Sequence, residues 1–181
     1  MKKTMWLKIG IPTAVLALLF SLPWITISFS TIPIPQIQYG EFPFRLEYEI
    51  NGQRVVVEDT VICEYDGIGI RHGVFGVPTA KYIKWKQHLA SNNNGYDAYI
   101  LLLKISGNVG VYYFVGDVRF YMGIDDYSNE DMPYFHNGRI YSAAYIDQSG
   151  STSIKADELL EKYGIKIISW EYSDPIVNTF K

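Results

Sequence analysis

Residues 44–58 read FRLEYEINGQRVVVE, and this stretch predicts a β-hairpin. Apolar and polar side chains alternate through residues 44–50, which is the period of a strand with one buried face. Asn51-Gly52 then supplies the pair that a type I′ turn prefers, because both residues tolerate positive φ. A two-residue turn sets the register of the hairpin, which pairs Ile50 with Gln53, Tyr48 with Val55, Leu46 with Val57, Glu49 with Arg54 and Arg45 with Glu58.

After the hairpin, short apolar runs separated by turn residues predict further strands. Two segments are ambiguous: KYIKWKQHL at 81–89 fits a strand better than a helix, and 117–122 fits a strand or a helical turn capped by Asp117. Other segments are predicted as a glycine-rich loop at 67–76, a strand at 96–105 buried on both faces, strands at 111–115, 139–146 and 165–170, and a helix at 155–163 capped by Gly164.

These elements define the expected fold class as α+β, mostly β. An N-terminal transmembrane helix precedes one predominantly antiparallel β domain with one short helix near the C-terminus. The 181 residues suffice for a single domain with a real core. The single cysteine, Cys63, excludes an intramolecular disulfide framework, and its place in a strand predicts a small buried hydrophobe.

The charges are divided unequally along the chain. Three of the 16 basic residues and none of the 19 acidic residues precede position 41, so this segment carries +3 and the remainder carries −6. An acidic outer part argues against nucleic acid as a partner, because phosphates need a clustered basic surface.

Residues 9–29, IGIPTAVLALLFSLPWITISF, contain no charge and predict a transmembrane helix. Trp6 and Trp24 lie 18 positions apart, roughly 27 Å along a helix, which would place one indole at each headgroup layer. The lysines at positions 2, 3 and 8 predict a cytoplasmic N-terminus. The lipid bilayer is therefore the first expected partner, and everything after the span is expected outside the cell membrane.

A cleaved signal peptide is the alternative to a signal anchor, because the segment also has a basic start and small residues around Phe29. The expected organisation is a cytoplasmic N-terminus at 1–8, a transmembrane helix at 9–29, a proline-containing stalk at 30–40 and an extracytoplasmic β-rich domain at 41–181.

Few residues suggest chemistry. The acidic segment 125–136 lacks the glycine and the glutamate that an EF-hand needs at its sixth and twelfth positions. The three histidines have no metal-ligand spacing, and no nucleophile motif occurs, so we predict no catalytic residue, no metal and no cofactor. Glu64 and Asp66, which share a strand face, are the best remaining candidates for acid–base catalysis.

Lys84, Lys86 and His88 lie on one face of the strand expected at 81–89, opposite Ile83 and Trp85. This face is either a basic patch for an anionic partner or a charged edge that prevents pairing with another sheet. The layout is common among bacterial envelope proteins and predicts a membrane-anchored, non-catalytic binding or accessory module, whose partner is an envelope polymer or a membrane protein. The alternative is an envelope hydrolase that uses Glu64 or Asp66.

Overall fold

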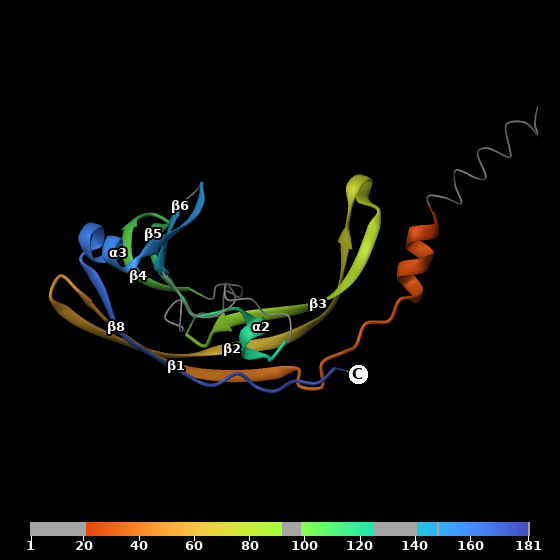
Figure 1. Ribbon diagram of the computed structural model, residues 1–181, viewed down its shortest axis with the longest axis horizontal. Helices are drawn as coiled ribbons and strands as arrows, with labels where there is room; N and C mark the ends of the chain where they lie inside the picture. Colours follow the sequence, from red (N-terminus) through yellow and green to blue (C-terminus); the bar gives the residue numbers. More distant parts are fainter. Residues whose placement is uncertain (1–20, 92–98, 125–140, 148, 181) are drawn as a thin grey trace, which may run out of the picture. The chain divides into compact units, whose positions relative to one another are not determined.

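The computed structural model describes residues 21–91, 99–124, 141–147 and 149–180, with the side chains of residues 141 and 142 excepted. This part of the chain is mostly antiparallel β-structure with short helices, which confirms the expected α+β, mostly β class (Figure 1). Its strands are β1 (Tyr39–Ile50), β2 (Gln53–His72), β3 (Pro78–Leu89), β4 (Tyr99–Ser106), β5 (Val109–Phe114), β6 (Tyr141–Asp147), β7 (Gly150–Lys155) and β8 (Ile165–Tyr172).

The chain divides into two compact units. The smaller unit comprises residues 1–34 and 66–84, and the larger unit comprises residues 35–65 and 85–181. Strands β2 and β3 contribute residues to both units. The sequence predicts one domain at 41–181 and does not separate residues 66–84 from it.

The strands form two four-stranded sheets, of order β3-β2-β1-β8 and β4-β5-β6-β7. The β1–β2 hairpin has the predicted register, with Ile50 opposite Gln53 and Tyr48 opposite Val55. Asn51 and Gly52 have φ values of 52° and 77°, as a type I′ turn requires. Turn chemistry and alternation thus fix this pairing locally.

The ion pairs on the other face of the hairpin differ in part from the prediction. Arg45 pairs with Glu58 at 3.4 Å, as expected. Arg54 lies opposite Glu49 in the register, but its guanidinium pairs with Glu47. A register shift between Glu47 and Tyr48, on the side of β1 that faces β8, accompanies the burial of both side chains.

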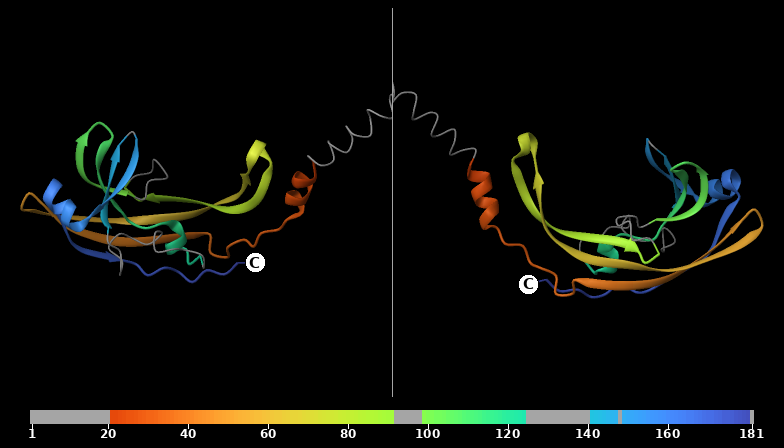
Figure 2. Two further views of the ribbon diagram at one scale, coloured as in Figure 1. Left: turned by 45° about the horizontal axis from the view of Figure 1, so that its top comes forward. Right: turned by 180° about the vertical axis from the view of Figure 1, so that it is seen from behind.

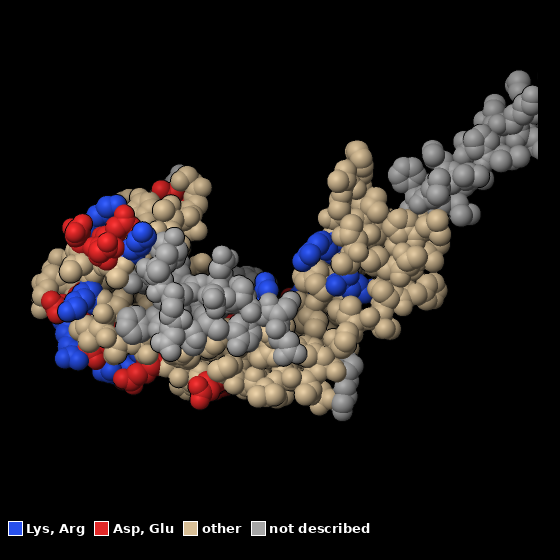
Figure 3. Space-filling view, viewed as in Figure 1, with Lys and Arg blue, Asp and Glu red and all other residues tan. Residues whose placement is uncertain are grey.

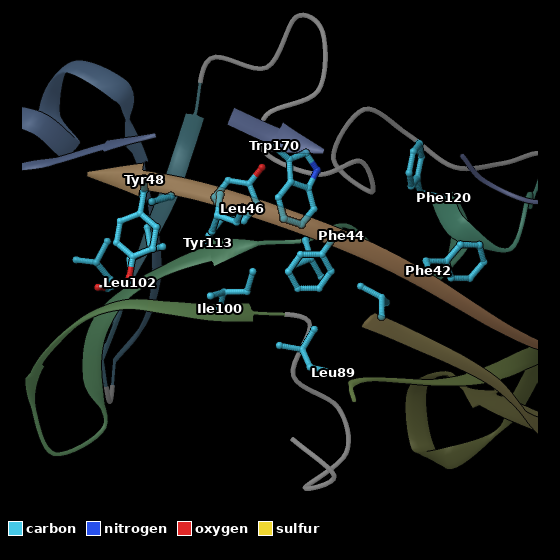
Figure 4. Close-up of a cluster of buried hydrophobic side chains, with 14 of the residues drawn as sticks. Phe42, Phe44, Leu46, Tyr48, Leu89, Ile100, Leu102, Tyr113, Phe120 and Trp170 are labelled. Carbon is cyan, nitrogen blue, oxygen red and sulfur yellow. Dashed lines mark hydrogen bonds between the residues drawn. The ribbon is translucent and has the colours of Figure 1, made fainter. Parts of the chain in front are cut away.

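The core of the larger unit lies between the two sheets (Figure 4). Alternate residues of β1 supply one side of it, and β4 and β5 supply the other. The ring of Trp170 from β8 joins the two sides, because its centroid lies 4.8 Å from that of Phe44 and 4.9 Å from that of Tyr113. Cys63 is fully buried in this core, as its strand position predicts.

Strand β4 is not the central strand that its apolar centre predicts. Ile100 and Leu102 are buried, whereas Leu101 is 45% exposed. Neighbouring side chains point to opposite faces of the sheet, so only one face of β4 is covered, and β4 is also an edge strand of its sheet. An apolar run does not show how many faces are covered.

Two short helices lie among the described residues of the larger unit. Helix α2 (Val118–Tyr121) begins after Asp117, whose carboxylate accepts the backbone N–H of Arg119 at 2.9 Å, so the helical alternative for 117–122 is correct. Helix α3 (Ala156–Tyr163) matches the predicted helix and ends at Gly164, which has a left-handed φ of 63°.

The expected stalk at 30–40 is only partly separate from the β-structure. The backbone N–H of Gln36 donates to the carbonyl of Thr179 at 2.9 Å. The side chain of Asn178 bonds both backbone groups of Ile37, at 3.1 and 2.8 Å. Residues from position 35 onward therefore belong to the larger unit.

Of the expected span at 9–29, only residues 21–29 are described, and they are helical. No helix within the described residues is both long and apolar enough to cross a membrane. Trp6 and the whole acidic segment 125–136 lie outside the described residues.

Candidate functional site

The predicted glycine-rich loop is instead the end of a hairpin, which we call the arm and define as residues 66–84. Strand β2 continues to His72, a 3-10 turn covers Val74–Gly76, and β3 starts at Pro78. The close backbone approach that the glycines suggest is present. A Cβ on Gly69 would lie 2.4 Å from the ring of Tyr82, so glycine lets this ring pack across the hairpin.

The turn at the end of the arm carries two exposed apolar side chains. Phe75 is 96% exposed and Val74 is 76% exposed. Phe75 also has φ 57° and ψ 24°, a left-handed conformation that is uncommon for an aromatic residue. An exposed aromatic side chain on a strained backbone is typical of a functional site, so this turn is a candidate binding surface.

Three backbone N–H groups of this turn are hydrogen-bonded within it. The N–H of Gly73 donates to the carbonyl of Val77 at 2.7 Å, and the N–H of Val77 donates to the carbonyl of Val74 at 3.4 Å. The N–H of Gly76 donates to the carbonyl of Gly73 at 3.2 Å. The end of the arm therefore presents apolar side chains on a turn in which the N–H groups of Gly73, Gly76 and Val77 have partners.

The arm lies beside the helical residues 21–29 (Figures 1 and 2). The ring centroids of Trp24 and His72 are 5.9 Å apart. The Lys81 ammonium donates to the carbonyls of Ser28, at 3.3 Å, and Ser30, at 2.6 Å. A lysine at this position satisfies carbonyls that the end of a helix leaves without an intrahelical partner.

The helical residues 21–29 have an apolar exterior. Phe29 is 82% exposed, and Trp24 and Ile25 are each about half exposed. The hydroxyls of Thr26 and Ser28 donate to backbone carbonyls one turn earlier, at 3.1 and 2.7 Å. Polar side chains satisfied within their own helix are suited to an apolar environment.

The arm is basic, whereas the chain from position 41 onward is acidic as a whole. It contains Arg71, Lys81 and Lys84, and its one acidic residue, Asp66, pairs with Lys84 at 2.9 Å. The Arg71 guanidinium lies 6.0 Å from the ring centroid of Tyr82. On the face shown in Figure 3 the end of the arm is uncharged, and basic side chains lie nearer its base.

The structure does not assemble the basic patch as predicted. Residues 81–89 are in a strand, but His88 is only 6% exposed and does not contribute to a surface. Lys84 pairs with Asp66 in the smaller unit, whereas Lys86 is half-buried and belongs to the larger unit. Strand β3 is an edge strand, a position where lysines discourage pairing with another sheet. Binding of an anionic partner by this strand stays a prediction.

The candidate acid–base groups and the thiol do not form a reactive site among the described residues. Asp66 is exposed and paired with Lys84, and it belongs to the smaller unit, whereas Glu64 belongs to the larger one. Burial raises the pKa of the Cys63 thiol far above its ordinary value, which keeps it neutral and unreactive. Among the described residues, no cluster of His, Cys, Asp and Glu could hold a metal ion.

A hollow of about 510 Å³ in the larger unit is lined mainly by apolar and aromatic side chains, including Leu89, Tyr99 and Tyr112. Its one acidic residue is Asp59, whose carboxylate accepts the backbone N–H groups of Thr60, at 2.7 Å, and Ser91, at 3.2 Å. This carboxylate therefore holds the adjoining chain in place.

A second hollow of about 610 Å³ lies over the outer face of the β1–β2–β8 sheet. Its lining includes Glu58 and Glu171, which lie 3.4 and 3.8 Å from the Arg45 guanidinium. These carboxylates belong to an ion-pair network. Neither hollow is lined by Glu64 or Asp66.

Sequence reasoning does not single out Val74 and Phe75, because a glycine-rich stretch is interpreted as a loop. The available signal is a pair of apolar residues between Gly73 and Gly76, within a stretch that lacks acidic residues from 67 to 83.

Comparisons with known proteins find no match, whether against family models, curated proteins or solved structures. The function therefore has to be inferred from the residues and contacts of the chain itself.

Proposed function

We propose that this protein is a single-pass, membrane-anchored module of the bacterial cell envelope that binds a partner and catalyses no reaction. Residues 9–29 span the cell membrane, residues 1–8 remain in the cytoplasm, and the β-rich part of the chain lies outside. Trp6 and Trp24 mark the two headgroup layers. The partner is an envelope polymer or a neighbouring membrane protein.

The observation that carries the proposal is the contact between the arm and residues 21–29. At the end of the proposed span, Lys81 satisfies the carbonyls of Ser28 and Ser30. The helix itself shows lipid-compatible apolar side chains and internally bonded hydroxyls. These features support a helix that leaves the bilayer at this point and is fixed to a folded part of the chain.

Binding is favoured over catalysis because the candidate reactive groups have other roles. Cys63 is a buried core residue, Asp66 is an ion-pair partner of Lys84, and Asp59 bonds backbone N–H groups. Phe75, by contrast, is the most exposed large apolar side chain among the described residues, and it lies next to the exposed Val74 at the end of the arm. An exposed apolar group on a pre-formed turn is suited to recognition.

The anchor is tested by extracting membranes from cells that express the full chain. Alkaline carbonate should leave the protein in the membrane pellet, whereas L16R combined with L19R should release it. Each arginine at the centre of a span costs about 2.5–3.5 kcal/mol on insertion scales. A wild-type chain recovered in the soluble fraction, with a mature N-terminus that begins after Ser30, would show a cleaved signal peptide and contradict the anchor.

The binding role is tested by crosslinking in intact cells, followed by purification of the full chain. The proposal expects one stoichiometric partner, or retention of the purified chain on isolated wall polymer at low salt. A chain that retains neither partner would not be a binding module. Hydrolysis of envelope material that is lost in D66N would instead establish the hydrolase.

A further inference from the structure

We infer that the end of the arm, Val74 and Phe75, inserts into the outer headgroup layer of the bilayer as a second membrane contact beside the anchor. This inference rests on the proposed anchor at residues 9–29. It assigns a specific ligand, phospholipid, to a surface that the anchor proposal leaves unexplained.

The arm is placed at the right depth by its contacts with the helix. Trp24 is the residue that the sequence assigns to the outer headgroup layer, and its ring lies 5.9 Å from that of His72. His72 precedes Phe75 by three residues, and the arm residue Lys81 bonds the helix end. If the helix is in the membrane, the arm is held against the membrane surface.

The chemistry of the turn suits an interface between water and lipid. Phe75 and Val74 project almost fully exposed apolar groups. The N–H groups of Gly73, Gly76 and Val77 are bonded within the turn, so moving it among headgroups leaves these donors satisfied. Aromatic and aliphatic side chains on a polar support are typical of segments that lie in the headgroup region.

The charges of the arm match a phospholipid surface. Residues 67–83 include Arg71 and Lys81 and no acidic residue, whereas the chain from position 41 onward carries −6. Basic side chains just behind apolar ones attract lipid phosphates, and acidic ones would be repelled from anionic lipid. Lipid therefore fits this surface better than a basic protein face would.

The test measures the depth of the arm in the full chain, reconstituted into vesicles of phosphatidylcholine and phosphatidylglycerol. Cys63 is buried, so a thiol-reactive fluorophore selects a cysteine introduced by F75C or, independently, by V74C. The matched control is V177C, because Val177 is 88% exposed and lies in the larger unit. Flotation of the same vesicles reports anchoring.

We expect the protein to float and the label at 75 or 74 to emit at shorter wavelength. Lipid that carries a nitroxide near the headgroup should quench this emission about twofold or more, and the label at 177 should not respond. If the protein floats but both arm labels remain in water, the inference fails and the anchor stands.

Two other outcomes also overturn the inference. Labels that are shielded from water but insensitive to the nitroxide lipid would show that protein, such as a second copy of the chain, covers the arm. Protein that does not float would overturn the anchor and the insertion together.

Discussion

Gly123 shows how one missing side chain permits the packing of the C-terminal segment. Its φ is 61°, and a Cβ there would lie 2.0 Å from the carbonyl oxygen of Ile176. The adjoining backbone is joined by the N–H of Ile176, which donates to the carbonyl of Tyr121 at 2.9 Å. Both the conformation and the close approach therefore require glycine.

We predict that G123A lowers the free energy of unfolding by about 3 kcal/mol or more, because backbone must move as well as adopt a strained φ. The matched control is G107A, since Gly107 also has positive φ, 51°, but nothing lies within 4 Å of its Cβ position. That change should cost only about 1 kcal/mol. Urea unfolding of the full chain in mild detergent measures both, and equal losses would contradict the close contact.

The buried thiol of Cys63 makes the stability of the fold depend on pH in the alkaline range. Burial raises the pKa of its thiol in the folded chain, whereas the thiol of an unfolded chain ionises near 9.0. Burial raises the pKa of the Tyr121 hydroxyl in the same direction. Because the folded pKa is the higher one, the stability contributed by each neutral group is complete below its unfolded pKa and falls as pH rises above it.

We therefore predict that stability starts to fall above pH 9, by about 1.4 kcal/mol per pH unit for the thiol. C63V should remove the loss of stability that comes from the thiol. The loss that comes from ionisation of Tyr121, which begins near pH 10, should remain. The measurement is the urea midpoint at intervals from pH 7 to 11. A wild-type midpoint that is constant between pH 9 and 10 would show that the thiol is not buried.

At the scale of elements, the β1–β2 hairpin was predictable in register because its signals are local. Alternation fixes which face is buried, and Asn51-Gly52 fixes the turn. The same holds for α3, whose cap Gly164 follows good helix formers. What local pattern could not give is the number of covered faces of β4, because this depends on what packs against each face of its sheet.

The arm was missed for a related physical reason. A glycine-rich stretch predicts a loop, yet Gly69 lies in a strand, where the absence of a side chain lets the Tyr82 ring pack against its backbone. The candidate site was therefore predictable only in part, as an anchor containing Trp24. The ring of Trp24 contacts that of His72, and this contact could not be predicted because His72 is far from Trp24 in the sequence.

The ion pairs of β1 lead to a prediction about this element. Glu47 is 3% exposed, and its carboxylate pairs with Arg45 at 3.1 Å and with Arg54. We expect E47Q to destabilise the chain by about 1–3 kcal/mol, because a buried charged acceptor of two guanidinium groups is lost. E49Q, at an exposed position of the same strand, should change stability by no more than about 0.5 kcal/mol.

Thermal unfolding in detergent compares the two variants at equal ionic strength. Similar melting temperatures for E47Q and E49Q would show that the pairing of Glu47 contributes nothing. A larger effect of E49Q would support the directly opposed Glu49–Arg54 pair that the register alone suggests.

At the scale of the whole molecule, charge and hydropathy divide the chain into parts with different surroundings. The first 40 residues carry +3 and contain the uncharged run, and the acidic residues all follow. The arm is the basic exception within the later part, and it groups with the N-terminal residues as one compact unit. This division supports the proposed anchor at residues 9–29 and the proposed contact of the arm with lipid.

Reporter fusions at the C-terminus determine the orientation of such a protein in cells. With the full chain inserted as proposed, alkaline phosphatase fused after Lys181 should be active, because it folds only outside the cytoplasm. A reporter that is active only in the cytoplasm should be silent at the same position. A silent phosphatase together with an active cytoplasmic reporter would place the β-rich part inside the cell and contradict the proposed anchor and orientation.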